Sequence, residues 1–164
     1  MVVVVAIVAL VVAIGVYATW LGSRLDRLDT RVEAASASLD AQLRKRAGAA
    51  ARAAARHPAA ATKAGLAEAA HTVLQSGGPR HEAAESALTR ALRGFLEALP
   101  RGQIAAADLT DVTAAATRVQ LARQFHNDAV HATRALRGRR LVRLLRIAAR
   151  RPLPAYFEID DSLG

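Results

Sequence analysis

Two short patterns in this sequence have the spacing of metal ligands on a helix. Glu68 and His71 are three residues apart, which places a carboxylate and an imidazole on one helical face, as in di-iron bundles. Such a site needs a second copy and two further glutamates, and only one copy occurs. His81-Glu82 followed by Glu85 approaches the zinc-protease motif but lacks its second histidine. A solvated helical face is favoured, with a metal-binding or enzymatic bundle as the alternative.

The remaining candidate residues do not form a nucleophile, a base and an orienting group. The chain has no cysteine, which excludes disulfides, thiolate metal ligands and cysteine nucleophiles. His126 and His131 are five residues apart and do not share a helical face. We therefore expect a protein that is not an enzyme and has no cofactor, catalytic residue or metal site.

A run of arginines near the C-terminus is the strongest charge feature. Residues 137–151 contain seven arginines and no acid, and so account for seven of the net charge of +9. Leucines interleave with them, and such a stretch suits an anionic bilayer surface. The alternatives are a basic loop whose leucines pack on a helical bundle, and phosphate binding, although no aromatic platform for nucleic acid is present. The predicted lipid-surface residues are Arg139, Arg140, Arg143, Arg146, Arg150 and Arg151.

The element that positions everything else is an uncharged N-terminal stretch. No charged side chain occurs between Val2 and Leu21, and at about 1.5 Å per residue such a helix spans roughly 30 Å, the thickness of a bilayer core. A signal peptide would have a basic start and a shorter apolar core. We predict a transmembrane anchor over residues 1–22. Its marker residues are Val2, Leu10, Gly15, Tyr17, Trp20 and Leu21.

The charges that follow this stretch predict its orientation. Arg24, Arg27 and Arg31 come directly after it, and no basic side chain precedes it. Because basic residues stay on the cytoplasmic side, we expect a single-pass protein of the cell membrane with a short outside N-terminus and a cytoplasmic body.

Hydrophobic periodicity predicts an all-α body. A heptad-like stripe on the first helix favours coiled-coil packing, and it comprises Leu21, Leu25, Leu28, Val32, Ala35 and Leu39. Helices are predicted to run to Arg56 and over residues 59–75, 80–99 and 103–137. The inner face of the last is expected to contain Leu109, Val112, Ala116, Val119, Phe125, Ala129, Val130, Thr133 and Leu136. The anchor thus continues into an antiparallel bundle of about four helices, two of them long, over residues 23–137. A basic-apolar segment and an acidic tail follow over residues 138–164.

Three stretches together resemble the LemA family of bacterial membrane proteins. Residues 31–46 have a valine-acid start, a Leu-Asp pair and Gln-Leu before basic residues. Residues 122–130 resemble the family's run of arginine, aromatic and Asn-Asp-Ala-Val, and residues 154–158 resemble its Pro-x-Tyr-Phe ending. The matching residues are Leu39, Asp40, Gln42, Leu43, Phe125, Asn127, Asp128, Tyr156, Phe157 and Glu158. The resemblance, as to a divergent member, implies an N-terminal anchor and a cytoplasmic bundle of long helices, and no known reaction.

Physical roles can be assigned to several of these residues. Leu39, Leu43 and Phe125 are expected in the core, and Asn127 or Asp128 is expected to bridge to Arg44 or Arg46 on the first helix. The predicted function is a membrane-anchored scaffold or adaptor that binds the bilayer and presents helices to a protein partner or to another copy of itself. The alternatives are the metal-binding or enzymatic bundle, and lipid or nucleic-acid binding through the arginines.

Overall fold

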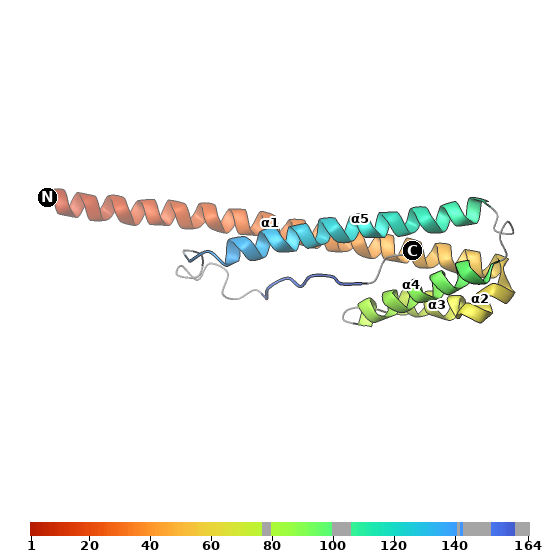
Figure 1. The fold of residues 1–164 in the computed structure, drawn as a ribbon. Coiled ribbons are helices and arrows are strands. Elements are labelled where there is room, and N and C mark those ends of the chain that lie inside the picture. The colour runs from red at the N-terminus through yellow and green to blue at the C-terminus, as the bar shows by residue number, and fades with distance from the viewer. Residues whose placement is uncertain (77–79, 100–105, 141, 143–151, 160–164) are drawn as a thin grey trace. The chain divides into compact units, whose positions relative to one another are not determined.

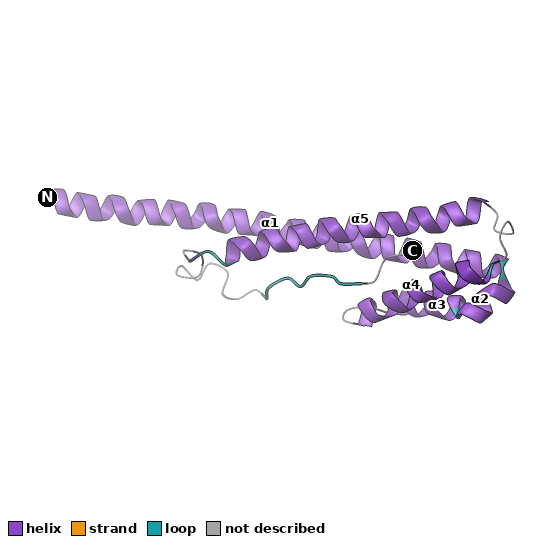
Figure 2. Cartoon of the chain, viewed as in Figure 1, coloured by secondary structure: helices purple, strands orange, loops and turns teal. Residues whose placement is uncertain are grey.

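The chain folds into helices. The structure is a computed structural model that describes residues 1–76, 80–99, 106–140, 142 and 152–159. No strand occurs among these residues, so the predicted all-α fold class is confirmed (Figures 1 and 2). The helices are α1 (Val2–Arg56), α2 (Pro58–Ala64), α3 (Leu66–Gln75), α4 (Arg80–Ala98) and α5 (Ala106–Arg137).

The chain divides into two compact units. Unit 1 consists of Met1–Ala35 and Asn127–Tyr156, and unit 2 consists of Ser36–His126 and Phe157–Gly164. α1 and α5 are each continuous helices that contribute to both units.

A proline ends α1 where the sequence predicts. His57 precedes Pro58, and its backbone leaves the helical region with φ of −130° and ψ of 64°. Proline disfavours the helical conformation of the residue before it, while its own fixed φ suits the first turn of a new helix. α1 therefore stops at Arg56 and α2 begins at Pro58.

The single helix predicted over residues 59–75 is wrong, because Gly65 divides it into α2 and α3. Gly65 has a φ of 63°, and the cap N–H groups at this end of α2 donate to the carbonyls of Ala61 and Thr62. This left-handed conformation costs glycine little because it has no Cβ, so the chain ends one helix and starts another at the same residue.

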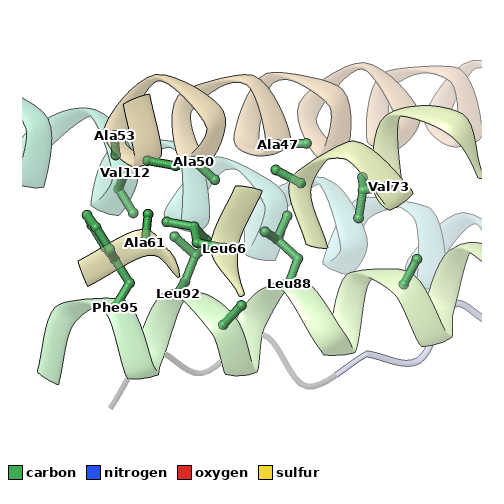
Figure 3. Packing of buried hydrophobic residues seen from close by; sticks show 14 of the residues in the cluster. Ala47, Ala50, Ala53, Ala61, Leu66, Val73, Leu88, Leu92, Phe95 and Val112 are labelled. Carbon is green, nitrogen blue, oxygen red and sulfur yellow. The ribbon is translucent and has the colours of Figure 1, made fainter. Parts of the chain in front are cut away.

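Alanines of α1 and α2 and larger side chains of α3, α4 and α5 form the core of unit 2. Figure 3 shows Ala50 of α1 near Leu66 of α3, and Ala53 of α1 near Val112 of α5. Leu88 and Leu92 of α4 are completely buried in this cluster. Alanine contributes little apolar area, so the larger side chains on the other helices supply most of the buried hydrophobic surface. The cluster also contains Leu66, Val73, Phe95 and Val112.

The predicted inner face of α5 is only partly correct. Most of its members, such as Val112 and Val119, are buried, but Leu109 and Phe125 are 40% and 58% exposed. Phe125 follows Val119 by six residues, which is about 240° around a helix, so it points away from the side that Val119 packs against. The expectation that Phe125 belongs to the core is therefore wrong.

In unit 1, α5 runs antiparallel to the first part of α1. Leu136 and Val142, at the end of α5 and beyond, pack against Leu21 and Leu25, with Leu28 beside them. Of the predicted stripe on α1, Leu21, Leu25 and Leu39 are buried and the others are half-buried. The stripe is therefore the face through which α1 contacts the rest of the protein.

The first part of α1 exposes a large apolar surface. Val2 to Trp20 include almost all of the exposed large hydrophobic side chains of the helix, and an 18-residue window has a mean hydropathy of 2.8 with none of it buried. Among the described residues, this is the one helix long and apolar enough to cross a membrane (Figure 1). Soluble monomers rarely expose apolar patches this extensive.

Candidate functional site

Arg137 joins three segments of unit 1. Its Nη2 donates to both carboxylate oxygens of Asp29 at 3.0 Å, and its Nη1 donates to the carbonyl of Pro152 at 2.8 Å. The side chains of Arg137 and Asp29 are 7% and 16% exposed. A planar guanidinium is suited to this arrangement, because its rigid fork can bind a carboxylate and still reach another acceptor. Arg137 thereby links α5 to α1 and to the C-terminal part of the chain.

A second arginine of α5 holds the same extended stretch, residues 152–156, which we call the proline segment. Arg134 Nε donates to the carbonyl of Pro154 at 2.8 Å, and its Cζ lies 4.8 Å from the centroid of the Tyr156 ring. The hydroxyl of Tyr156 lies 3.5 Å from His131 Nδ1. The prolines have no N–H to donate, so the segment binds α5 through carbonyl oxygens and a ring face.

Beside Arg137 lies a pocket of about 660 Å³. Acidic residues of α1 line one side, and the prolines with Leu153 line the other. The pocket contains no cysteine, serine or histidine, and the described residues hold no group of three metal-ligating side chains anywhere. Among the described residues, the pocket thus offers carboxylates, a threonine hydroxyl and a guanidinium. Its lining residues are Asp26, Asp29, Thr30, Val32, Glu33, Arg137, Pro152, Leu153 and Pro154.

Two of the predicted lipid-surface arginines lie level with the end of the apolar stretch. Arg139 and Arg140 are exposed, and the neighbouring Leu136 and Val142 pack against Leu21 and Leu25. From α1, Arg24 lies 5.5 Å from the centroid of the Trp20 ring. The other predicted members, Arg143, Arg146, Arg150 and Arg151, lie outside the described residues.

Unit 2 contains a buried ion pair that the sequence analysis does not predict. Arg46 of α1 donates through Nη2 to the carboxylate of Glu85 and, at 3.4 Å, to its backbone carbonyl, and both side chains are fully buried. In the sequence, Glu85 belongs only to an incomplete zinc motif. A signal was present nonetheless, because Glu85 precedes Leu88 and Leu92 at the three- and four-residue spacing of the apolar face.

The other candidate chemical residues are dispersed. Glu68 and His71 are exposed on α3, where the His71 Nε2 lies 2.8 Å from the Gln75 side-chain nitrogen. His126 is buried and His131 is exposed, while the side chain of His81 lies outside the described residues. None of these histidines comes together with acids into a metal-binding group within the described part of the chain.

The residues of the LemA resemblance fall into packing and surface roles. Leu39 and Leu43 are buried with Val119 and Ala122, and Phe157 packs against this cluster. Asp40 binds Arg44 at 2.9 Å, and the Glu158 N–H donates to Glu82 Oε1 at 3.2 Å. Gln42 and Asn127 are half-buried, Asp128 is exposed, and Tyr156 lies against Arg134.

The two arginines predicted to bridge to Asn127 or Asp128 have partners within unit 2. Arg44 binds Asp40 and Arg46 binds Glu85 instead. A four-residue step on one helix brings Arg44 and Asp40 together without a second helix, and the apolar face of α4 carries Glu85 to Arg46.

Comparisons with family models, with curated proteins and with solved structures find no match to this chain.

Proposed function

We propose that this chain is a membrane-anchored helical scaffold of the LemA type, without catalytic chemistry of its own. It crosses the cell membrane once, through the start of α1, and presents its helices to a protein partner or to another copy of itself. The observation that carries the proposal is the fully exposed apolar stretch of α1, which continues without a break into residues packed in both units. A bilayer would cover that surface, and the helix would hold the body at the membrane.

The charges beyond the stretch support a cytoplasmic body. Arg24, Arg27 and Arg31 follow the apolar residues, and basic residues near a span remain in the cytoplasm. Trp20 and Tyr17 lie close to this end, with ring centroids 5.9 Å apart, and aromatic rings favour the headgroup layer.

Alkaline extraction and flotation of the full chain test the anchor. The wild-type chain is expected to stay with membranes in alkali and to float with vesicles. A Val8→Arg, Val11→Arg variant is expected to be released, since each central arginine costs about 2.5–3.5 kcal/mol on an insertion scale. Placing the same two arginines at Ala34 and Ala37, which are exposed beyond the stretch and have the same spacing, is the matched control. Release of the wild-type chain, or a mature protein shortened at its start, would contradict the proposal.

Orientation is tested separately by cysteine labelling. The chain contains no cysteine, so a single Ser38→Cys variant reports one exposed position on the body. An impermeant thiol reagent should label it only after the cells are broken. Labelling in intact cells would place the body outside.

A second candidate function is docking of unit 1 on anionic headgroups. The contacts of Leu136 and Val142 with Leu21 and Leu25 favour it, because they bring Arg139 and Arg140 beside the end of the proposed span. Each arginine close to an anionic leaflet contributes about 1 kcal/mol.

Amide exchange of the full chain in vesicles tests this docking. Phosphatidylglycerol, compared with phosphatidylcholine alone, should slow exchange around residues 136–142, and an Arg139→Gln, Arg140→Gln variant should lose the difference. Arg44→Gln, an exposed arginine of unit 2, is the control. Equal protection in both lipids would exclude the headgroup contact.

A further inference from the structure

α5 carries a second apolar face that the described part of the chain leaves exposed. Leu121 and Phe125 are 51% and 58% exposed, while Val119 and Ala122 beside them are buried. The two exposed side chains are four residues apart and therefore adjacent on the outer side of the helix. An exposed leucine alone is ordinary, whereas this adjacent leucine and phenylalanine form one contiguous apolar patch.

These two residues are the centre of a longer stripe. The residues on this outer side of α5 follow one another at alternating steps of three and four residues, which is the spacing of a seam between two helices. All are exposed or half-buried, and α5 is continuous across them. The stripe consists of Asp111, Ala114, Arg118, Leu121, Phe125, Asp128, Ala132 and Ala135.

The order of charges along the stripe is self-complementary. Arg118 lies three residues before Leu121, and Asp128 lies three residues after Phe125. When two copies of α5 cross antiparallel at position 123, Leu121 meets Phe125 of the other copy. Arg118 then faces Asp128 on both sides of that contact, and Ala114 faces Ala132.

A parallel pair would place like residues opposite each other. Arg118 would face Arg118, and Asp128 would face Asp128, so both charged layers would repel. The side chains of Arg118 and Asp128 make no hydrogen bond or ion pair with another residue in the described part of the chain. We infer that the outer face of α5 binds the same face of a second copy in the antiparallel direction, a two-fold symmetric contact.

The inference deepens the proposed function, and its consequence for membranes rests on the proposed anchor. In unit 1, α5 runs toward the apolar stretch, since Leu136 and Val142 contact Leu21 and Leu25. An antiparallel pair therefore has its two anchors at opposite ends, and the paired copies belong to facing membranes. One short apolar contact is weak, but many copies on each surface raise the overall avidity.

Cysteine crosslinking of the full chain in detergent tests the pairing without a membrane. Because the native chain has no cysteine, a Leu121→Cys copy mixed with a Phe125→Cys copy reports the antiparallel contact directly. The mixture should give more disulfide dimer than either variant alone. More dimer from Leu121→Cys alone would indicate a parallel contact, and no dimer in any sample would indicate no pairing. Either result overturns the inference.

Clustering of vesicles tests the joining of two membranes. The full chain is placed in phosphatidylcholine vesicles, whose surface has no net charge to attract the arginines. Arg118→Asp alone makes both charged layers repulsive and should weaken clustering about tenfold. Adding Asp128→Arg to the same copy restores opposite charges in both layers and should restore clustering. A double variant that clusters no better than the single one would overturn the charge pairing.

A matched apolar control lies on the same helix. Leu121→Asp should abolish clustering, whereas Leu109→Asp should not, because Leu109 is also exposed but lies off the stripe. Flotation separates the two proposals: a chain that fails to float refutes the anchor while crosslinking still decides the pairing. A chain that floats and crosslinks antiparallel but does not cluster vesicles refutes the joining of facing membranes.

Discussion

Arg46 of unit 2 and Arg137 of unit 1 each bind a carboxylate on another helix, and the surroundings of the two pairs differ. The Arg46 and Glu85 side chains of unit 2 are completely buried, whereas those of Arg137 and Asp29 in unit 1 keep some exposure. Arg46 binds only Glu85 among the described residues, through its carboxylate and its carbonyl. Arg137 binds Asp29 and, in addition, the carbonyl of Pro152.

Because of this difference, we expect breaking the buried pair to cost more unfolding free energy, and breaking the partly exposed pair to affect more of the chain. A fully buried pair has no water to replace a lost partner, so removal of one member leaves a charge stranded in the core. A partly exposed pair can regain water and loses less free energy. Because Arg137 also binds the proline segment, however, its loss should release a further part of the chain.

The largest expected effect comes from breaking the buried pair. Glu85→Ala leaves the Arg46 guanidinium buried without its counter-charge and should lower the unfolding free energy by about 3–5 kcal/mol. Urea unfolding of the full chain in detergent, followed by circular dichroism, measures this. The double variant Arg46→Met, Glu85→Leu should recover most of the loss, since an apolar pair can replace a buried ion pair. Equal stability of the wild type and Glu85→Ala would show that burial does not set the cost.

A smaller loss of stability with a wider structural consequence is expected at Arg137. Arg137→Lys removes the planar fork that binds Asp29 and Pro152 together, and should cost about 1–3 kcal/mol. Amide exchange at Ala155 and Tyr156 should also accelerate, because the proline segment loses an attachment. Arg139→Lys, at an exposed position, is the control. Unchanged exchange in Arg137→Lys would mean that this arginine does not hold the segment.

The ring contact of Tyr156 should matter less. Tyr156→Leu removes the face that lies against Arg134 and should weaken attachment of the segment by about 0.5–1 kcal/mol. Tyr156→Phe keeps the ring and loses only the hydroxyl near His131, so it should behave like the wild type in the same exchange experiment. If both variants exchange faster than the wild type and at the same rate as each other, the hydroxyl and not the ring provides the contact.

The smallest effect is expected at the exposed pair of Asp40 and Arg44. Both side chains are about half exposed, and a helical pair of this kind contributes at most about 0.5 kcal/mol and less in salt. Arg44→Ala should therefore shift the unfolding midpoint only slightly, and less so at high salt. A loss comparable to that of Glu85→Ala would contradict the dependence on burial.

Local features were predictable because neighbouring residues alone determine them. The end of α1 follows from Pro58, and the buried side of α1 follows from the spacing of Leu21, Leu25 and Leu39. Gly65 could have been recognised as a helix end, but glycine is also tolerated inside helices, and only its positive φ decides.

Choices between partners could not be predicted in the same way. The spacing places Arg46 and Glu85 on apolar faces, but nothing local says that these two faces meet. α5 has apolar side chains on opposite sides, and the three- and four-residue steps through Phe125 are as regular as those through Val119. Which side packs inward depends on distant helices. The proline segment has no periodicity at all, and its attachment depends on two arginines that its own sequence does not indicate.

The alanine surface of α1 in unit 2 has a consequence for how this protein can vary. Ala47, Ala50 and Ala53 are almost completely enclosed by neighbouring helices, with no flexible side chain of their own to rearrange. Steric clearance, more than hydrophobicity, therefore limits what these positions accept. Exposed residues of α1 beyond the apolar stretch, such as Ala34 and Ala37, have room for larger side chains, whereas these buried alanines must stay small or be compensated by trimming of a facing leucine.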